Sequence, residues 1–403
     1  MKKLYFDYAA STPVDSRVLK AMLPYFLEKF GNPGSLHSFG QEAMAGVDSA
    51  RGTIAKSLGA DFRQIIFTSS ATEANNLVIK GAVASFKSRV NSPKPRIIVS
   101  AIEHESVLES ARAIEKFGAE VVYLSVDREG RVNPKELKGK LNERTAIVSV
   151  MFGNNEIGTI QPIQKIAKVI GDFRKGLGDG VSGMASGRNS KSLNPSGYTP
   201  YPIFHSDASQ AFQYLDCNVE ILGVDALTIS SQKIYGPKGA GALYIKDPKT
   251  ILPVISGGAQ EFGMRSGTEN VPAIVGFGRA VELACKLRKA EAKRIATLKN
   301  YFWSEIKSAF KNVEVNGSQS GGLPHIINLY FPGLLAEELL TRLDLSGFAV
   351  SSGSACRSRS AKPSEIILAL GYGKERAMRS LRVSFGRQTG KADIDKLVKE
   401  LKK

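Results

Sequence analysis

The chain has 403 residues, of which 42% are hydrophobic and 23% charged, and its formal net charge is +17. This length suggests about two or three domains, and the ordinary content of 39 Gly and 17 Pro excludes collagen-like and wholly disordered classes. The 55 basic against 38 acidic residues favour acidic partners, although a solvated basic face explains the same excess equally well.

From about residue 50 to residue 250, short apolar runs rich in β-branched residues alternate with amphipathic stretches of helical length, such as 73–86 and 106–117. This alternation is typical of an α/β fold built from βαβ units, with a mostly parallel sheet flanked by helices. The predicted strands are residues 64–67, 96–100, 121–124, 146–151, 202–206, 226–229 and 241–245.

One segment interrupts this alternation. Between residues 176 and 197, 13 of 22 residues are Gly, Ser or Asn. The segment connects a predicted helix, 163–174, to the strand that precedes Asp207, and such connections usually have about two to six residues. We interpret 176–197 as a flexible insertion, because its composition cannot bury enough apolar surface to order it. As a helix-to-strand connection it should lie at the amino ends of the strands, away from residues at their carboxyl ends.

The C-terminal part begins with a long helical pattern, from about residue 272 to residue 310, rich in Ala, Lys and Glu. Beyond it, a smaller α+β unit is predicted. Its strands are 326–330 and 381–384, and its helices are 336–343 and 394–401. We expect a large α/β domain of residues 14–288 and a small domain formed by residues 1–13 and 289–403.

Ligands of a doubly wound sheet bind beyond the carboxyl ends of its strands, so the residues that follow each run are candidates. After the first run, a turn of small and hydroxyl residues with Ala71 and Thr72 opens a helix, whose N-terminus can hold a phosphate or simply be capped. His104 could stack on a flat ligand, or only cap a helix. Asn155 lies in a polar turn that could face the same place.

Asp207 ends another run, where a carboxylate can pair with a ring nitrogen or cap a helix. Lys233 follows the next run, just before a Gly-Pro turn. Desolvation on rigid backbone lowers the pKa of a lysine and makes its amine nucleophilic toward an aldehyde, whereas most single turn lysines are merely exposed. A phosphate turn, a flat-ring partner, a carboxylate and a lysine together are what pyridoxal phosphate requires.

Longer motifs support this interpretation. They are Asp207-x-x-Gln210, Gln232-Lys233-Ile234-Tyr235-Gly236-Pro237-Lys238-Gly239, Gly263-Met264-Arg265-Ser266-Gly267-Thr268 and Ser351-Ser352-Gly353-Ser354-Ala355-Cys356. From Asp7 to Arg387 the chain resembles cysteine desulfurases, which belong to the class V aminotransferase superfamily of pyridoxal-phosphate fold type I. The last motif resembles the NifS/IscS group with a long cysteine loop, which supplies sulfur for iron–sulfur clusters and thiolated tRNA.

The resemblance implies that the chain removes sulfur from L-cysteine, releasing L-alanine and leaving a persulfide on Cys356. Lys233 would bind the cofactor covalently and move the α-proton, and His104 would stack on the ring. Arg382, with Asn155, would bind the substrate carboxylate. The cofactor-binding residues implied are Ala71, Thr72, His104, Asn155, Asp207, Gln210, Ser230, Gln232, Lys233 and Thr268.

Two of these residues have further implications. Thr268 would reach the phosphate of a partner subunit, so the resemblance implies a homodimer. Gln232 stands where the family usually has His; a glutamine can donate to phosphate but cannot titrate.

The cysteines differ in their surroundings. Cys356 lies among small residues next to Arg357 and Arg359, whose charges favour a thiolate. We expect Cys217 and Cys285 to be small buried hydrophobic residues. The three cysteines are widely spaced and the four histidines scattered, so neither a disulfide framework nor a metal site is predicted.

The partners and the location follow from the same observations. No run is apolar for the roughly 18 residues of a membrane span, and no secretory signal precedes Asp7, so we expect a cytoplasmic protein. An acidic sulfur acceptor or scaffold protein is expected, and direct nucleic-acid binding is not. The alternatives are a transaminase of the same superfamily and a non-catalytic module that keeps the fold; the presence of Lys233 and Asp207 argues against the second.

Overall fold

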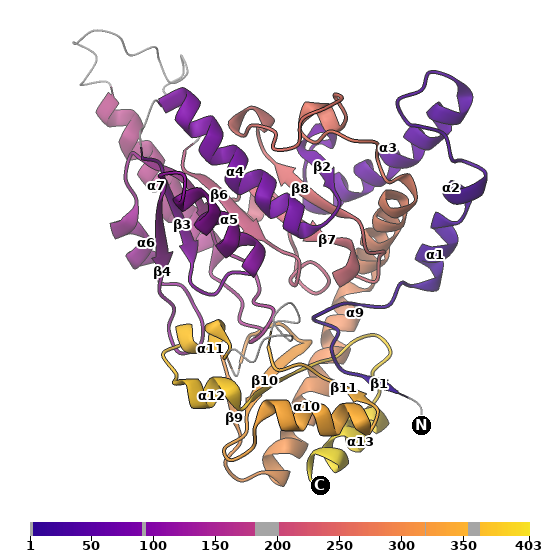
Figure 1. Cartoon of the computed structure of the whole chain (residues 1–403), viewed down its shortest axis with the longest axis vertical. Helices are drawn as coiled ribbons and strands as arrows, with labels where there is room; N and C mark the ends of the chain where they lie inside the picture. The colour runs from indigo at the N-terminus through magenta and orange to yellow at the C-terminus, as the bar shows by residue number, and fades with distance from the viewer. Residues whose placement is uncertain (1–2, 91–93, 182–200, 319, 354–362) are drawn as a thin grey trace.

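The computed structural model describes residues 3–90, 94–181, 201–318, 320–353 and 363–403, and a seven-stranded sheet forms the upper part of the molecule (Figure 1). The strand order is β2-β8-β7-β6-β5-β3-β4; β8 runs antiparallel to both neighbours, and the other adjacent pairs are parallel. The predicted mostly parallel sheet is confirmed, each strand lying within two residues of its prediction. The strands are β2 (Ile65–Thr68), β3 (Arg96–Ser100), β4 (Glu120–Leu124), β5 (Thr145–Ser149), β6 (Ile203–Asp207), β7 (Ala226–Ser230) and β8 (Gly241–Ile245).

Helices cover both faces of this sheet, because side chains alternate along each strand. Ile97 and Val99 of β3 belong to the core formed with α4 (Ala71–Val90) and α5 (Glu105–Glu115). Ile98 belongs to the opposite core, formed with α3 (Ser38–Leu58), α7 (Ile163–Val181) and the first half of α9 (Val271–Ala309). Continuous apolar strands are therefore explained by burial on both faces.

Helix α7 corrects one prediction. We expected an insertion to begin at Gly176, but α7 continues to Val181. The apolar side chains Ile163, Ile166 and Ile170 anchor the helix to the core, and an anchored helix can extend through glycines that cost about 1 kcal/mol each. The remainder of the expected insertion, 182–197, lies outside the described residues. After it the chain enters β6 at Ile203, the opposite end of the strand from Asp207.

The lower part of the molecule has its own sheet and core. Strands β12 (Ser380–Ser384), β10 (Ile326–Tyr330) and β9 (Glu314–Asn316) are antiparallel. Helices α10 (Ala336–Leu345) and α13 (Lys391–Leu401) pack there with Phe302 and Ile306 of α9. The predicted smaller α+β unit is thus confirmed, its helices and strands starting or ending within three residues of the prediction.

Two segments connect the parts (Figure 1). In α9, residues up to Ala284 belong to the upper core and residues from Ile295 to the lower core; the expected boundary at 288 lies inside this helix and stays a prediction. At the other end of the chain, β1 (Leu4–Tyr5) pairs with β11 (Phe348–Ala349) in the lower part, and α1 (Ser16–Met22) contacts α9.

The short helices complete the description. They are α2 (Pro24–Leu27), α6 (Pro134–Lys140), α8 (Val219–Leu222), α11 (Glu365–Ala369), α12 (Lys374–Met378) and the 3-10 helices η1 (Phe62–Gln64), η2 (Ser231–Lys233), η3 (Pro248–Thr250) and η4 (Glu261–Gly263). Within the described part of the chain, every helix is too short or too polar to cross a membrane.

Candidate active site

The carboxyl ends of four adjacent strands bring five of the expected site residues together. His104 caps α5 after β3, and Asn155 lies in the turn after β5. Asp207 ends β6, Ser230 ends β7 and Lys233 ends η2 directly behind it. Because β3, β5, β6 and β7 are neighbours in the sheet, these residues share one edge.

The N-terminal segment that crosses between the two parts holds Lys233. Its Nζ donates to the carbonyl oxygens of Ala9 and Ala10, both at 2.7 Å. The amide Nε2 of Gln210 donates to the same Ala9 carbonyl at 2.7 Å. Thr12 fixes the backbone beside the lysine, since its Oγ1 donates to the carbonyl of Gln232 at 2.9 Å. The lysine amine is thus held by two backbone carbonyls of the N-terminal segment.

Asp207 is buried, with 5% of its surface exposed. Its Oδ1 accepts a hydrogen bond from the backbone N–H of Ser209 at 2.9 Å, and its Oδ2 accepts one from Asn75 Nδ2 at 2.8 Å. Both carboxyl oxygens therefore accept hydrogen bonds from N–H groups.

His104 presents a neutral ring. Burial lowers its pKa below the ordinary value of 6.5; the nearby charge of Asp207 opposes this shift and that of Lys233 adds to it. The backbone N–H of Ser106 donates to His104 Nδ1 at 3.1 Å, and the Ser106 hydroxyl lies 2.8 Å from the same nitrogen. An uncharged imidazole suits stacking on a flat ligand better than it suits cation binding.

The turn at the start of α4 lies against β8. A Cβ on Gly241 would come within 2.6 Å of the Ser70 carbonyl carbon, so only glycine permits this approach. Ala71 and Thr72 open the helix there. Arg265 Nε donates to Glu73 at 2.7 Å in the first turn, which brings the Gly263–Thr268 motif to the same place; Thr268 itself is exposed.

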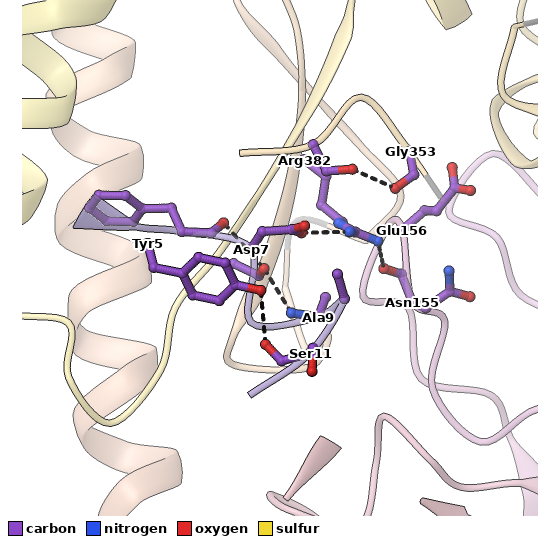
Figure 2. A network of polar contacts seen from close by, with 12 residues as sticks. Tyr5, Asp7, Ala9, Ser11, Asn155, Glu156, Gly353 and Arg382 are labelled. Atoms are coloured by element: carbon purple, nitrogen blue, oxygen red, sulfur yellow. Dashed lines mark hydrogen bonds and ion pairs between the residues drawn. The ribbon is translucent and has the colours of Figure 1, made fainter. Parts of the chain in front are cut away.

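Arg382 joins three segments of the site (Figure 2). Its side chain is 1% exposed, and its Nη2 donates to Asp7 at 2.7 Å while its Nη1 donates to the Asn155 carbonyl at 2.8 Å. Its backbone exchanges two hydrogen bonds with Ser351, which leads to the cysteine motif. The side-chain Oδ1 of Asn155 is buried without a hydrogen-bond partner among the described residues, so it is open to a ligand.

The expected nucleophile Cys356, with Arg357 and Arg359, lies outside the described residues. The residues on both sides of that segment are at the site. The hydroxyl of Ser364 donates to Glu156 Oε2 at 2.6 Å, and a Cβ on Gly353 would lie 3.3 Å from that same oxygen. Figure 2 shows Glu156 beside Gly353.

The two other cysteines differ in their burial. Cys217 is buried, and burial raises the pKa of its thiol to about 12. Cys285 is exposed on α9, so our expectation that it is buried was wrong. It follows a pair of buried residues, Leu283 and Ala284, and lies where the helix turns its next residues outward.

Four residues of the site were not predicted: Asn75, Ser106, Asp7 and His325. His325 is buried, stacks on Tyr214 with ring centres 4.5 Å apart, and its Nε2 lies 3.2 Å from Gln210 Oε1. Burial, with the charges of Lys299, Arg382 and Lys233, lowers the pKa of His325 well below its ordinary value. A buried histidine in an apolar run gives no sequence signal that separates it from an ordinary core residue.

Known proteins resemble this chain over nearly its whole length. The family described as aminotransferase class-V matches residues 4–183 and 202–397, which leaves out most of the Gly-, Ser- and Asn-rich segment. A cysteine desulfurase IscS of Dictyoglomus turgidum is 42% identical over 98% of this chain and 92% of its own length. A putative cysteine desulfurase IscS 1 of Bacillus subtilis is 40% identical over 96% and 94%.

Solved structures give the same result. A NifS-like protein superposes with a TM-score of 0.86 at 32% identity, covering 99% of this chain and 98% of that one. A structure described as SspA in complex with cysteine superposes with a TM-score of 0.79 at 33% identity, covering 95% and 99%.

Proposed function

Since the chain belongs to the class V aminotransferase family and, within it, to the cysteine desulfurases, we propose that it takes sulfur from L-cysteine, releasing L-alanine and leaving a persulfide on Cys356. The observation that carries the proposal is the grouping of Lys233 and Asp207 at adjacent strand ends with the buried guanidinium of Arg382. Lys233 and Arg382 are both hydrogen-bonded to residues 7–10.

The side chains present fit pyridoxal phosphate. Lys233 offers an amine for the aldehyde, Asp207 a carboxylate for the ring nitrogen, and His104 a neutral ring for the flat face. The buried, unpartnered Oδ1 of Asn155 is a polar atom that a ligand would satisfy. The α4 N-terminus suits a phosphate, with the backbone N–H of Ala71 and the polar side chains of Thr72, Ser230, Gln232 and Thr268.

When bound, the cofactor would supply an electron sink for the α-carbon of the substrate. Asp207 would keep a ring nitrogen protonated, and Gln210 would donate to the ring hydroxyl. Lys233 would hold the cofactor and then move the α-proton. Arg382 would bind the substrate carboxylate through its two-pronged geometry.

Sulfur transfer is assigned to Cys356. Its thiolate would attack the sulfur of the bound cysteine, so that an S–S bond forms while the Cβ–S bond breaks. The electron pair of the broken bond stays on carbon, and a proton taken up there completes alanine. The product on the protein is a persulfide, which a thiol can later remove. The basic residues Arg357 and Arg359 in the same stretch favour the thiolate.

One assay tests the function. The protein with L-cysteine and a thiol reductant should release alanine and sulfide in equal amounts, without any α-keto acid. Lys233→Ala should release neither, and Cys356→Ser should retain the bound cofactor while forming no persulfide. Alanine formed only when a keto acid is supplied would identify a transaminase instead. Borohydride trapping of the cofactor on a different lysine would contradict the role of Lys233.

We also propose a homodimer. Between residues 19 and 39, seven large apolar side chains are exposed, and exposed apolar surface of this kind is typical of an interface. Thr268 is exposed, so it is accessible to a partner subunit. The exposed side chains are Leu19, Leu23, Phe26, Leu27, Phe30, Leu36 and Phe39.

Light scattering should therefore give twice the chain mass of 43.5 kDa, and Leu27→Glu should yield an inactive monomer. An active monomer would refute the shared site. We further propose that the enzyme is cytoplasmic and that its sulfur acceptor or scaffold protein is acidic, which the net charge of +17 supports. Sulfur transfer to such an acceptor should weaken as ionic strength rises.

A further inference from the structure

Asn75 lies one turn inside α4 and is completely buried. Its Nδ2 donates to Asp207 Oδ2 and to Ser106 Oγ, each at 2.8 Å. An amide nitrogen carries two hydrogens, so both are used in these two bonds. One nitrogen atom thus connects the strand end that carries the carboxylate with the start of α5.

The orientation of this amide is fixed by its neighbour. Exchanging its nitrogen and oxygen would place two acceptor oxygens 2.8 Å apart, one of them on the Asp207 carboxylate. In the observed orientation, Asn75 Oδ1 is buried and has no hydrogen-bond partner among the described residues. A buried, unpartnered carbonyl oxygen is costly, so packing alone does not explain an asparagine here.

The second bond leads to His104. Ser106 Oγ receives the Asn75 hydrogen, and its own hydrogen can then point to His104 Nδ1, 2.8 Å away. The backbone N–H of Ser106 also donates to Nδ1. With Nδ1 accepting from both, the proton of the neutral ring resides on Nε2.

We propose that Asn75 is a positioning residue that holds Asp207 and His104 as one unit, with the carboxylate turned to the ring nitrogen and the imidazole in its Nε2–H form. The two groups would act on the same bound ring, Asp207 at its nitrogen and His104 on its face. This role rests on the proposed function, because it presupposes that ring. It assigns a purpose to a buried amide that the reaction does not otherwise use.

Besides His104, the charge of Asp207 acts on two other titratable groups, Glu103 and His205. Burial, together with the charge of Asp207, raises the pKa of Glu103 well above its ordinary value. Burial lowers the pKa of His205 to about 4, and both groups are unchanged in the Asn75 variants. Lys233 lies at the end of the next strand and is likewise unchanged in these variants. A spectral change in an Asn75 variant near neutral pH would thus report on the amide itself.

The test uses three variants. Asn75→Leu keeps the size and removes both donors. Ser106→Ala removes the hydroxyl that connects Asn75 to His104 and keeps the backbone N–H bond to Nδ1. Asn76→Ala is the matched control, since Asn76 Nδ2 donates to the Thr72 carbonyl at 2.9 Å on the same helix. The readouts are the dissociation constant for pyridoxal phosphate, the pH midpoint of the bound cofactor's visible absorbance, and the ring ¹⁵N chemical shifts of His104 without cofactor.

Asn75→Leu should raise the dissociation constant about tenfold or more, move the pH midpoint, and disturb the His104 tautomer. Ser106→Ala should change the His104 shifts and leave the midpoint in place. Asn76→Ala should match the parent in all three. Parent-like affinity and midpoint in Asn75→Leu, or parent-like His104 shifts in Ser106→Ala, would overturn the proposal.

A second variant covers the case in which Asn75→Leu does not fold. Asn75→Asp keeps the shape and exchanges the donor for an acid that faces Asp207. Its cofactor affinity should fall relative to the parent as rising pH ionises the new acid; an affinity that follows the parent at every pH would overturn the proposal. If the parent itself fails to bind pyridoxal phosphate, the proposed function fails, while the His104 shifts still test the connection.

Discussion

Arg51 and Arg382 are both almost completely buried, and each pairs with a carboxylate from a distant part of the chain. Arg51 uses Nη1 and Nη2 to reach both oxygens of Glu261, at 2.7 and 2.8 Å. Arg382 reaches Asp7 through Nη2 at 2.7 Å, and its Nη1 donates to the Asn155 carbonyl instead.

The surroundings of the two pairs differ as well. The Glu261 side chain is 1% exposed and also accepts the backbone N–H of Phe67 at 2.8 Å, and three Phe rings lie around the Arg51 guanidinium. The Asp7 side chain is 17% exposed. A bidentate ion pair whose carboxylate has no access to water has a structural role. In contrast, an arginine that makes a single contact to a partly hydrated carboxylate can exchange that carboxylate for the carboxylate of a substrate. Burial of an arginine therefore does not by itself tell a structural pair from a binding site.

The largest effect on stability is expected at the Arg51–Glu261 pair. Arg51→Met should leave Glu261 buried and unpaired, which lowers the free energy of unfolding by about 3–5 kcal/mol. Urea unfolding followed by circular dichroism measures it. Arg379→Met is the control, because Arg379 pairs with an exposed Glu375 and such pairs contribute about 0–1 kcal/mol. Equal losses of unfolding free energy in the two variants would show that the buried Arg51–Glu261 pair is no more important for stability than an exposed pair.

At the exchangeable pair, the expected loss is in binding. Arg382→Ala removes a charge-assisted contact worth about 1.5–3 kcal/mol, so the Michaelis constant for L-cysteine should rise about 10–100-fold. Initial rates over a range of cysteine concentrations measure this. An unchanged Michaelis constant would argue against Arg382 as the carboxylate site.

Acid should lower the stability of the fold near the site through the buried His205, which lies on β6 two residues before Asp207. His205 lies between Ser149 and Thr228, and burial lowers its pKa from 6.5 to about 4. Below pH 6.5 the His205 imidazole binds a proton in the unfolded chain, whereas in the folded chain it binds one only near pH 4. Stability therefore falls as pH decreases through this window. The slope from this group is at most about 1.4 kcal/mol per pH unit.

The variant His205→Gln removes the titrating ring and should flatten that slope. Urea unfolding of parent and variant at several pH values across the window makes the comparison. A parent whose stability stays constant between pH 6.5 and pH 4, or a variant with the same slope, would show that the ring is not the source.

The smallest effect is expected at Asp7. Asp7→Asn keeps an oxygen acceptor for Arg382 and removes the charge that competes with the substrate, so the Michaelis constant for L-cysteine should fall about two- to fivefold. Asp15→Asn is a matched control, because Asp15 pairs with Arg17 and Arg387 rather than Arg382. A rise in the Michaelis constant would mean that Asp7 orients Arg382 and does not compete.

The strands were predictable because buried parallel strands appear as continuous apolar runs, and the site followed because ligands bind at their carboxyl ends. Lys233 and Asp207 were found in this way. The end of α7 was predicted too early because glycines usually indicate the end of a helix. In the structure the helix continues to Val181 because its apolar face is anchored to the core. Local composition alone does not contain that tertiary support.

Other residues lacked any local signal. Asn75 lies inside a predicted helix, where a polar residue normally faces solvent, and only the packing of α4 against α5 and β6 turns it to Asp207. Asp7 is 375 residues from Arg382, so no spacing rule connects them. The two residues that link the site together are therefore the ones that periodicity could not identify.

The site depends on residues from near both ends of the sequence, and this has a consequence for biosynthesis. Asp7 binds Arg382, and the backbone N–H of Ala9 donates to Ser384, each across 375 residues. At elongation rates of about 5–20 residues per second, the earlier partner waits on the order of 20–75 s for the later one to be translated. A ribosome-bound chain can therefore form much of the upper sheet before Arg382, the residue proposed to bind the substrate carboxylate, has been translated. Substrate binding then begins only when synthesis is nearly complete.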